Sequence, residues 1–174
     1  DHRADEQFAG LNYRATEVSG AILNAQLERI DEMLDRMRGQ KRTLLKVGEE
    51  VGLRSITNHS VDYECGTHVG FVFENEEKAR AFASSMKETV GKAFLPIDTG
   101  RHVYTRWDPI LRKQGAHHPS LNPFNLAENK ALNIEYSEDM CPNSLDILSR
   151  SVLIGMHPDN DRGKVDEIAE AIRT

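Results

Sequence analysis

The stretch from Gly10 to Asp31, GLNYRATEVSGAILNAQLERID, joins a short polar segment directly to a helical pattern. Apolar residues recur there and just beyond at spacings of four and three, which is the periodicity of one helix face. This apolar stripe consists of Leu23, Leu27, Ile30, Leu34 and Met37. It predicts one long helix from Tyr13 to Gly39, with Gly39 as its C-terminal stop. We expect the stripe to pack in a core or an interface, because a helix of that length often bridges two domains.

The rest of the chain alternates helices with short strands. Runs rich in β-branched and aromatic residues predict strands at residues 53–56, 68–73, 93–97 and 151–154, and residues 101–107 either continue the sheet or form a loop. Helices are expected at residues 41–51, after Asn75 up to Gly91, at 108–113, at 141–150 and at 163–173. The pattern predicts an α/β fold, a small sheet flanked by helices. Residues 1–40 would be a linking loop and interdomain helix, and residues 41–174 a small α/β domain.

Bulk composition excludes several classes of function. The formal net charge of -6 disfavours non-specific nucleic-acid binding, which needs a basic face. No apolar run approaches the roughly 20 residues that cross a membrane. Asp1–Gln7 is too polar for a signal peptide. The two cysteines, Cys65 and Cys141, lie far apart in the sequence, and such a pair is typical of free thiols in the cytoplasm.

Three polar residues, Asn12, Tyr13 and Arg14, stand where the long helix is expected to begin. Helix starts present free N–H groups and a partial positive charge, so these residues are placed to meet an anion. An ordinary N-cap with a surface arginine is the alternative. The paired histidines at 117–118 have no ligands at a zinc spacing, which favours a surface loop over a metal site. Cys141 before a proline is read as a small buried or capping residue rather than a nucleophile.

The pattern G-x-N-Y-R-x-x-E-x-x-x-A-x-x-x-x-Q-L-x-x-x-D in residues 10–31 resembles the sugar aminotransferases of the DegT/DnrJ/StrS group, which use pyridoxal phosphate (PLP). Two later stretches resemble the same family. Residues 99–104, TGRHVY, resemble its Gly/Thr-rich lead into H-x-Y. Residues 141–158 resemble its C-P to H-P passage, with Cys141-Pro142, Leu148, Val152-Leu153 and His157-Pro158 in the matching places.

This resemblance implies that the chain is the C-terminal small domain of a fold type I PLP-dependent enzyme, together with its linking helix. The intact homodimer would move an amino group from an amino acid such as glutamate to a keto or aldehyde sugar, and its Schiff-base lysine would precede residue 1. The family likeness implies that Asn12 donates to the cofactor phosphate of the neighbouring subunit. Arg14 would hold the donor's carboxylate. Tyr13, His102 and Tyr104 would approach the cofactor or substrate.

The chain also departs from the family pattern. Ala15 replaces the usual Met, Gly20-Ala21 replaces an Ala-Ala pair, and the segment from Gly115 to Asp139 is longer and richer in Asn and Pro. Long irregular loops are often functional, and in such enzymes a loop of this kind sets the sugar specificity. The sequence does not decide whether the sugar is a nucleotide-linked keto-deoxysugar, an inositol-type ketone or an eight-carbon sugar acid. The alternative function is a non-catalytic α/β binding or regulatory module.

Overall fold

The computed structural model describes residues 15–60, 62–91, 93–115 and 118–174. They fall into two compact units. One, which we call the sheet unit, contains residues 15–98 and 145–174, and the other, the loop unit, contains residues 99–144.

The sheet unit is built on a four-stranded antiparallel sheet with the strand order β1-β2-β4-β3. Its strands are β1 (Arg54–Ser55), β2 (His68–Val72), β3 (Ala93–Phe94) and β4 (Ser151–Gly155). In the central pair Val69 lies opposite Ile154 and Phe71 opposite Val152. Directly opposed residues share a face of the sheet, so these four side chains form one apolar surface. All four strands were expected from the sequence, although β1 and β3 are shorter than the predicted runs.

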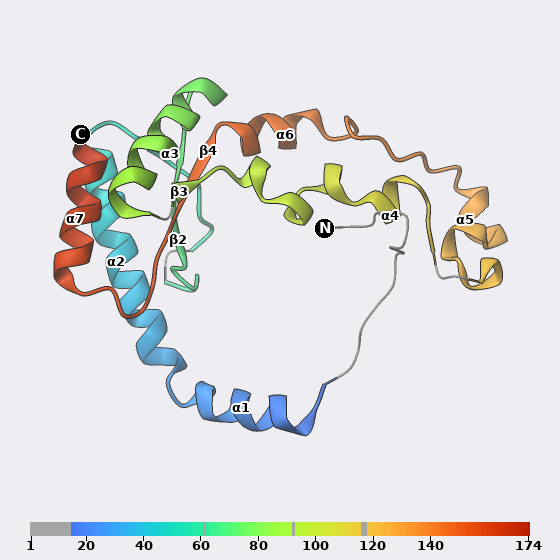
Figure 1. Ribbon diagram of the computed structural model, residues 1–174, viewed down its shortest axis with the longest axis horizontal. Helices are drawn as coiled ribbons and strands as arrows, with labels where there is room; N and C mark the ends of the chain where they lie inside the picture. Colours follow the sequence, from blue (N-terminus) through green and yellow to red (C-terminus); the bar gives the residue numbers. More distant parts are fainter. Residues whose placement is uncertain (1–14, 61, 92, 116–117) are drawn as a thin grey trace. The chain divides into compact units, whose positions relative to one another are not determined.

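Three helices cover that apolar surface: α2 (Ile30–Glu50), α3 (Glu76–Val90) and α7 (Arg162–Arg173). Figure 1 shows α2 and α7 side by side, and α7 also contacts α3. The helices fill the core with Leu44, Val47, Ala79, Ala83, Met86, Ile168, Ala169 and Ile172. The general α/β prediction is therefore confirmed.

The predicted long helix is wrong in both its start and its end. The structure has a helix α1 (Glu17–Leu27), capped by Thr16, and then a separate α2 that runs through Gly39 to Glu50. Gly39 does not stop α2, because buried side chains before and after it hold the helix against the core, which outweighs a cost of about 1 kcal/mol for an interior glycine. The left-handed turn comes at Gly52 instead, with φ of 78°. The boundary expected between residues 40 and 41 therefore falls inside α2.

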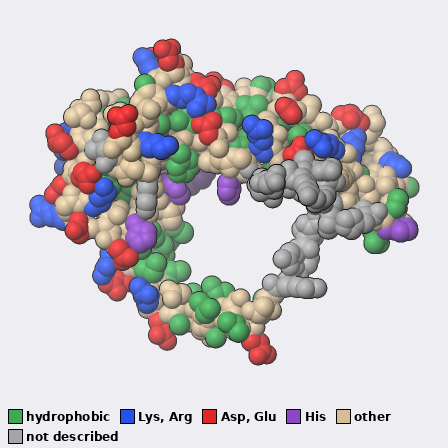
Figure 2. Space-filling view, in the orientation of Figure 1, with side chains coloured by type: hydrophobic (Ala, Val, Ile, Leu, Met, Phe, Trp, Pro, Cys, Tyr) green, Lys and Arg blue, Asp and Glu red, His purple; other side chains and the backbone are tan. Residues whose placement is uncertain are grey.

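The apolar stripe is buried only at its C-terminal end. Met37 is buried, whereas Leu23 and Leu27 on α1 are 62% and 59% exposed. Figure 2 shows the exposed apolar side chains gathered on α1. The stripe thus packs in the core on α2 but not on α1, which has no buried residue, and an interface for α1 stays a prediction.

The loop unit consists of short helical turns. They are η3 (Gly100–His102), η4 (Tyr104–Arg106), α4 (Asp108–Leu111), η5 (Pro119–Leu121), η6 (Pro123–Asn125) and α5 (Ala127–Ala131), and α6 (Pro142–Ser149) begins at its end. Residues 101–107 form turns rather than sheet, because i→i+3 hydrogen bonds such as Val103 N–H to Gly100 O (3.0 Å) close each one locally. No helix in the described part of the chain is both long and apolar enough to cross a membrane.

Candidate functional site

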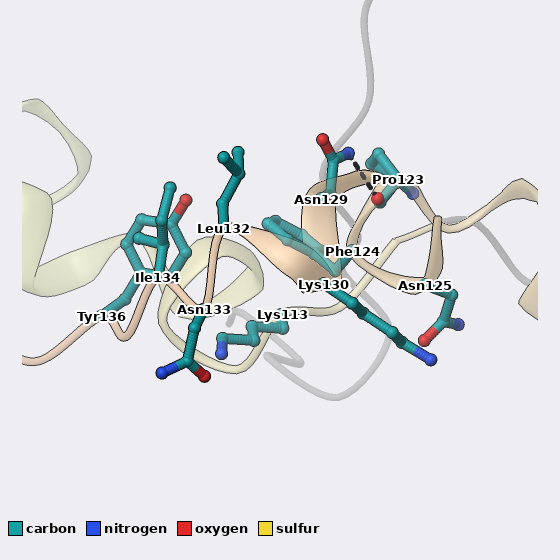
Figure 3. A pocket seen from close by; sticks show the side chains of 10 residues that line it. All are labelled: Lys113, Pro123, Phe124, Asn125, Asn129, Lys130, Leu132, Asn133, Ile134 and Tyr136. Atoms are coloured by element: carbon teal, nitrogen blue, oxygen red, sulfur yellow. Dashed lines mark hydrogen bonds between the residues drawn. The ribbon is translucent and has the colours of Figure 1, made fainter. Parts of the chain in front are cut away.

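The loop unit contains a pocket of about 430 Å³, which we call the loop pocket (Figure 3). Its walls come from the turn after α4, from η6 and α5, and from the irregular segment that follows α5. Ten residues line it: Lys113, Pro123, Phe124, Asn125, Asn129, Lys130, Leu132, Asn133, Ile134 and Tyr136. All lie within residues 113–136, and the expected functional segment, Gly115 to Asp139, contains nine of these ten.

Two left-handed residues shape the loop pocket. Lys113, after α4, has φ of 53°, and Asn133, after α5, has φ of 47°. A non-glycine residue at positive φ is uncommon, and Asn tolerates it better than most. These two turns bring the chain back on itself, so that residues 113 and 133–136 line the same cavity.

Side-chain amides hold the loop pocket together from within. Asn122 donates from Nδ2 to the Lys113 carbonyl (3.1 Å) and accepts from the Phe124 N–H at Oδ1 (3.0 Å). A Cβ at Gly115 would lie 2.4 Å from that Oδ1, so only glycine allows this approach. Asn129 donates to the Pro123 carbonyl at 2.7 Å. These bonds fix the backbone of a segment whose only regular elements are short helical turns.

The lining divides into a polar and an apolar side. In Figure 3 the side chains of Asn125, Lys130 and Asn133 point to one side, and Leu132 points to the other. The rings of Phe124 and Tyr136 meet edge to face, with centroids 6.2 Å apart and an interplanar angle of 75°. Small-molecule sites combine apolar side chains with placed polar groups, and the lining of the loop pocket contains both, with Asn and Lys making up half of it.

The two lysines that line the loop pocket differ in their ion pairing. Lys113 forms an ion pair with Glu135, with Nζ 2.9 Å from Oε1. Lys130 is exposed and has no ion pair within the described ranges. No carboxylate belongs to the lining among the residues that the structure describes. Within that part of the chain, the loop pocket therefore presents one positive charge without an ion-pair partner.

The site residues expected from the sequence do not meet in this cavity. Asn12, Tyr13 and Arg14 lie outside the described residues. His102 is exposed on η3 and does not line the loop pocket. Tyr104 is half-buried, and its hydroxyl donates to the Glu138 carbonyl (2.7 Å) and accepts from the Cys141 N–H (3.1 Å).

Tyr104 thereby ties together the two ends of the segment that carries the loop pocket. Its hydroxyl group donates to a backbone carbonyl, so in the described conformation this side chain has a structural role. Sequence reasoning selected the pocket's segment but none of its lining residues. The feature of the sequence that could have indicated the lining residues is the combination of asparagines, lysines and aromatic residues between positions 113 and 136.

A second, smaller cavity of about 190 Å³ lies in the sheet unit around a buried ion pair. Lys41 on α2 is only 5% exposed, and its ammonium contacts the Glu64 carboxylate. Arg38 donates from Nε to the Glu64 carbonyl at 2.6 Å. Burial first, and the charge of Lys41 second, lower the pKa of His68 below its ordinary 6.5. These contacts fasten the turn before β2 to α2.

A PLP site needs a lysine amine for the covalent link and donors for the phosphate. Lys41 is held by Glu64 and Lys113 by Glu135, and the resemblance assigns the phosphate contact to Asn12, outside the described residues. The residues that the structure describes do not make up such a site. Nor do three or more His, Cys, Asp or Glu side chains gather there in an arrangement that could hold a metal.

No protein-family model and no curated protein matches this chain. The similarity to sugar aminotransferases therefore rests on the three sequence stretches alone.

Proposed function

We propose that this chain is the sugar-binding part of a PLP-dependent aminotransferase, which transfers an amino group from an amino acid such as glutamate to a keto or aldehyde sugar. The observation that carries the proposal is the loop pocket, because it lies between the H-x-Y and C-P stretches that resemble the family. Its segment is also where the chain departs most from the family pattern, as a substrate-specific loop would.

The lining of the loop pocket suits a sugar. A pyranose ring offers a C–H face to aromatic and aliphatic side chains, which Phe124, Tyr136 and Leu132 can provide. Its hydroxyl groups need both donors and acceptors, and an amide side chain supplies both. Asn125 and Asn129 are already oriented by bonds to the Pro119 and Pro123 carbonyls, at 3.0 and 2.7 Å. Preorganised polar groups reduce the entropy cost of binding.

The remaining roles follow from the resemblance. PLP, when bound, acts as the electron sink for the transfer. Asn12 would donate to its phosphate across a homodimer, Arg14 would hold the donor's carboxylate, and Tyr13 and His102 would lie near the substrate. Tyr104 would act by positioning the segment of the loop pocket. Both cysteines are exposed and free, which is consistent with the cytoplasm as the compartment of the protein.

The test uses the complete gene product. Purified protein is incubated with PLP, and we expect the visible absorbance of protein-bound cofactor and amino transfer from glutamate to a keto sugar. Asn12→Ala should weaken PLP binding, whereas Asn24→Ala, an exposed residue on α1, should leave it unchanged. Unchanged PLP affinity in Asn12→Ala would refute the phosphate assignment, and a protein that never binds PLP would refute the enzyme.

A non-catalytic binding module is the second candidate, and one observation favours it. All the described residues that line the loop pocket belong to the loop unit, so none of the described residues of the sheet unit takes part in binding there. Sugar binding by the complete protein with neither PLP binding nor amino transfer would identify this module.

A further inference from the structure

We propose that the sugar bound in the loop pocket is a sugar acid, recognised through one carboxylate by Lys130. This inference rests on the proposed sugar-binding function and narrows its substrate. It favours one of the three sugar classes that the sequence leaves open, and it disfavours inositol-type ketones and nucleotide-linked sugars.

The charge of the loop pocket carries the argument. Two lysines line it, and Glu135 pairs with Lys113 at 2.9 Å. One positive charge, that of Lys130, remains without a partner in the described part of the chain. A single carboxylate would match it, whereas a neutral cyclitol would leave it unused.

A nucleotide-linked sugar fits less well. Its diphosphate carries two negative charges, and the described lining offers one lysine without a partner, so only one of the two charges would be matched. The volume of about 430 Å³ lies near the lower end of ligand pockets and suits a single sugar ring better than a sugar with a nucleotide.

Asn133 completes the recognition. Its side chain has no hydrogen-bond partner within the described residues, and in Figure 3 it points to the same side of the pocket as Lys130. An amide on the same side of the pocket as Lys130 can donate to a hydroxyl group of the bound sugar. We therefore place the carboxylate at the polar side and the carbon face of the ring against Phe124.

Glucose and glucuronate test this directly, because they differ only by a carboxylate in place of a hydroxymethyl group. Binding to the complete protein is measured by ligand-observed NMR titration, with UDP-glucose, myo-inositol and inorganic phosphate as further probes. We expect glucuronate to bind about fivefold to tenfold more tightly than glucose, since a charge-assisted hydrogen bond is stronger than a neutral one but an exposed site reduces the gain. Added salt should weaken glucuronate alone.

Variants assign the effect to one side chain. Lys130→Met should lower the affinity for glucuronate to that for glucose, which should not change. Lys130→Arg keeps the charge and should retain most of the preference. Lys46→Met removes an exposed lysine of α2, in the sheet unit, and should have no effect. Circular dichroism of each variant confirms that the fold is intact.

The outcomes separate the two proposals. Equal binding of glucose and glucuronate, or a preference that survives Lys130→Met, overturns the carboxylate assignment and leaves the sugar pocket standing. If UDP-glucose binds most tightly and inorganic phosphate competes with it, the ligand is a phosphorylated sugar and not a sugar acid. Failure of every sugar to bind overturns the sugar pocket itself.

Discussion

Two glycines of α2 should respond in opposite directions to the same substitution. Gly39 and Gly48 both lie inside the helix, and a Cβ at Gly39 would meet nothing within 4 Å. Gly39→Ala should therefore stabilise the protein by about 0.5–1 kcal/mol, the difference in helix propensity between the two residues.

At Gly48 the added carbon would lie 2.3 Å from Cε1 and 2.6 Å from Cζ of Phe71. That ring is 0% exposed and packs edge-on against Phe82, with centroids 6.2 Å apart, so it has little room to move. Overpacking of this severity costs about 2–3 kcal/mol, and helix propensity offsets up to about 1. Gly48→Ala should thus destabilise the protein by about 1–2 kcal/mol net.

Urea denaturation followed by circular dichroism measures both free energies of unfolding, and amide hydrogen exchange in α2 reports the sheet unit separately from the loop unit. Phe71→Leu shortens the obstructing side chain, so it should cost less in the Gly48→Ala background than alone. If alanine stabilises the protein equally at both positions, the tight contact between α2 and β2 is not present.

Three further perturbations test the remaining contacts. Burial and the charge of Lys41 lower the pKa of His68, so the folded state binds the proton of His68 less readily than the unfolded state. The urea midpoint should therefore fall as the pH drops below 6.5, and His68→Gln should reduce this pH dependence. Lys41→Met leaves Glu64 without its ion-pair partner and should lower the free energy of unfolding by about 3 kcal/mol. A double variant that also carries Glu64→Gln should recover much of this loss. If the single and the double variant lose the same free energy, the two side chains are not coupled. Tyr104→Phe removes two hydrogen bonds and should lower the free energy of unfolding by about 1–2 kcal/mol. Hydrogen exchange at the Cys141 amide should become faster, and unchanged exchange there would show that Tyr104 does not hold the ends of the loop together.

The elements that could be predicted from sequence are those whose signals are local. Asn75 caps α3 by accepting from the Lys78 N–H at 2.9 Å, and Gly91 ends that helix in the left-handed conformation with φ of 74°. β2 and β4 were predicted from β-branched and aromatic runs, and they form the centre of the sheet. Each of these features depends on residues within a few positions of one another.

The predictions that failed depended on distant residues. Gly39 has the composition of a helix stop, but the packing of α2 against the core decides where the helix ends. The apolar residues of α1 continue the stripe of α2 but lie outside this core, so for them only packing in an interface stays a prediction. Periodicity shows that a face is apolar and not which partner covers it.

By itself, the sequence determined the α/β class, the central strands and the caps of α3, because short-range backbone preferences and apolar periodicity encode them. Only the tertiary structure decided that Lys113 and Tyr136 share a cavity and that, among its described lining residues, Lys130 is the lysine without an ion-pair partner. Both depend on left-handed turns at Lys113 and Asn133 and on amide bonds across the loop, which bring together side chains more than twenty residues apart.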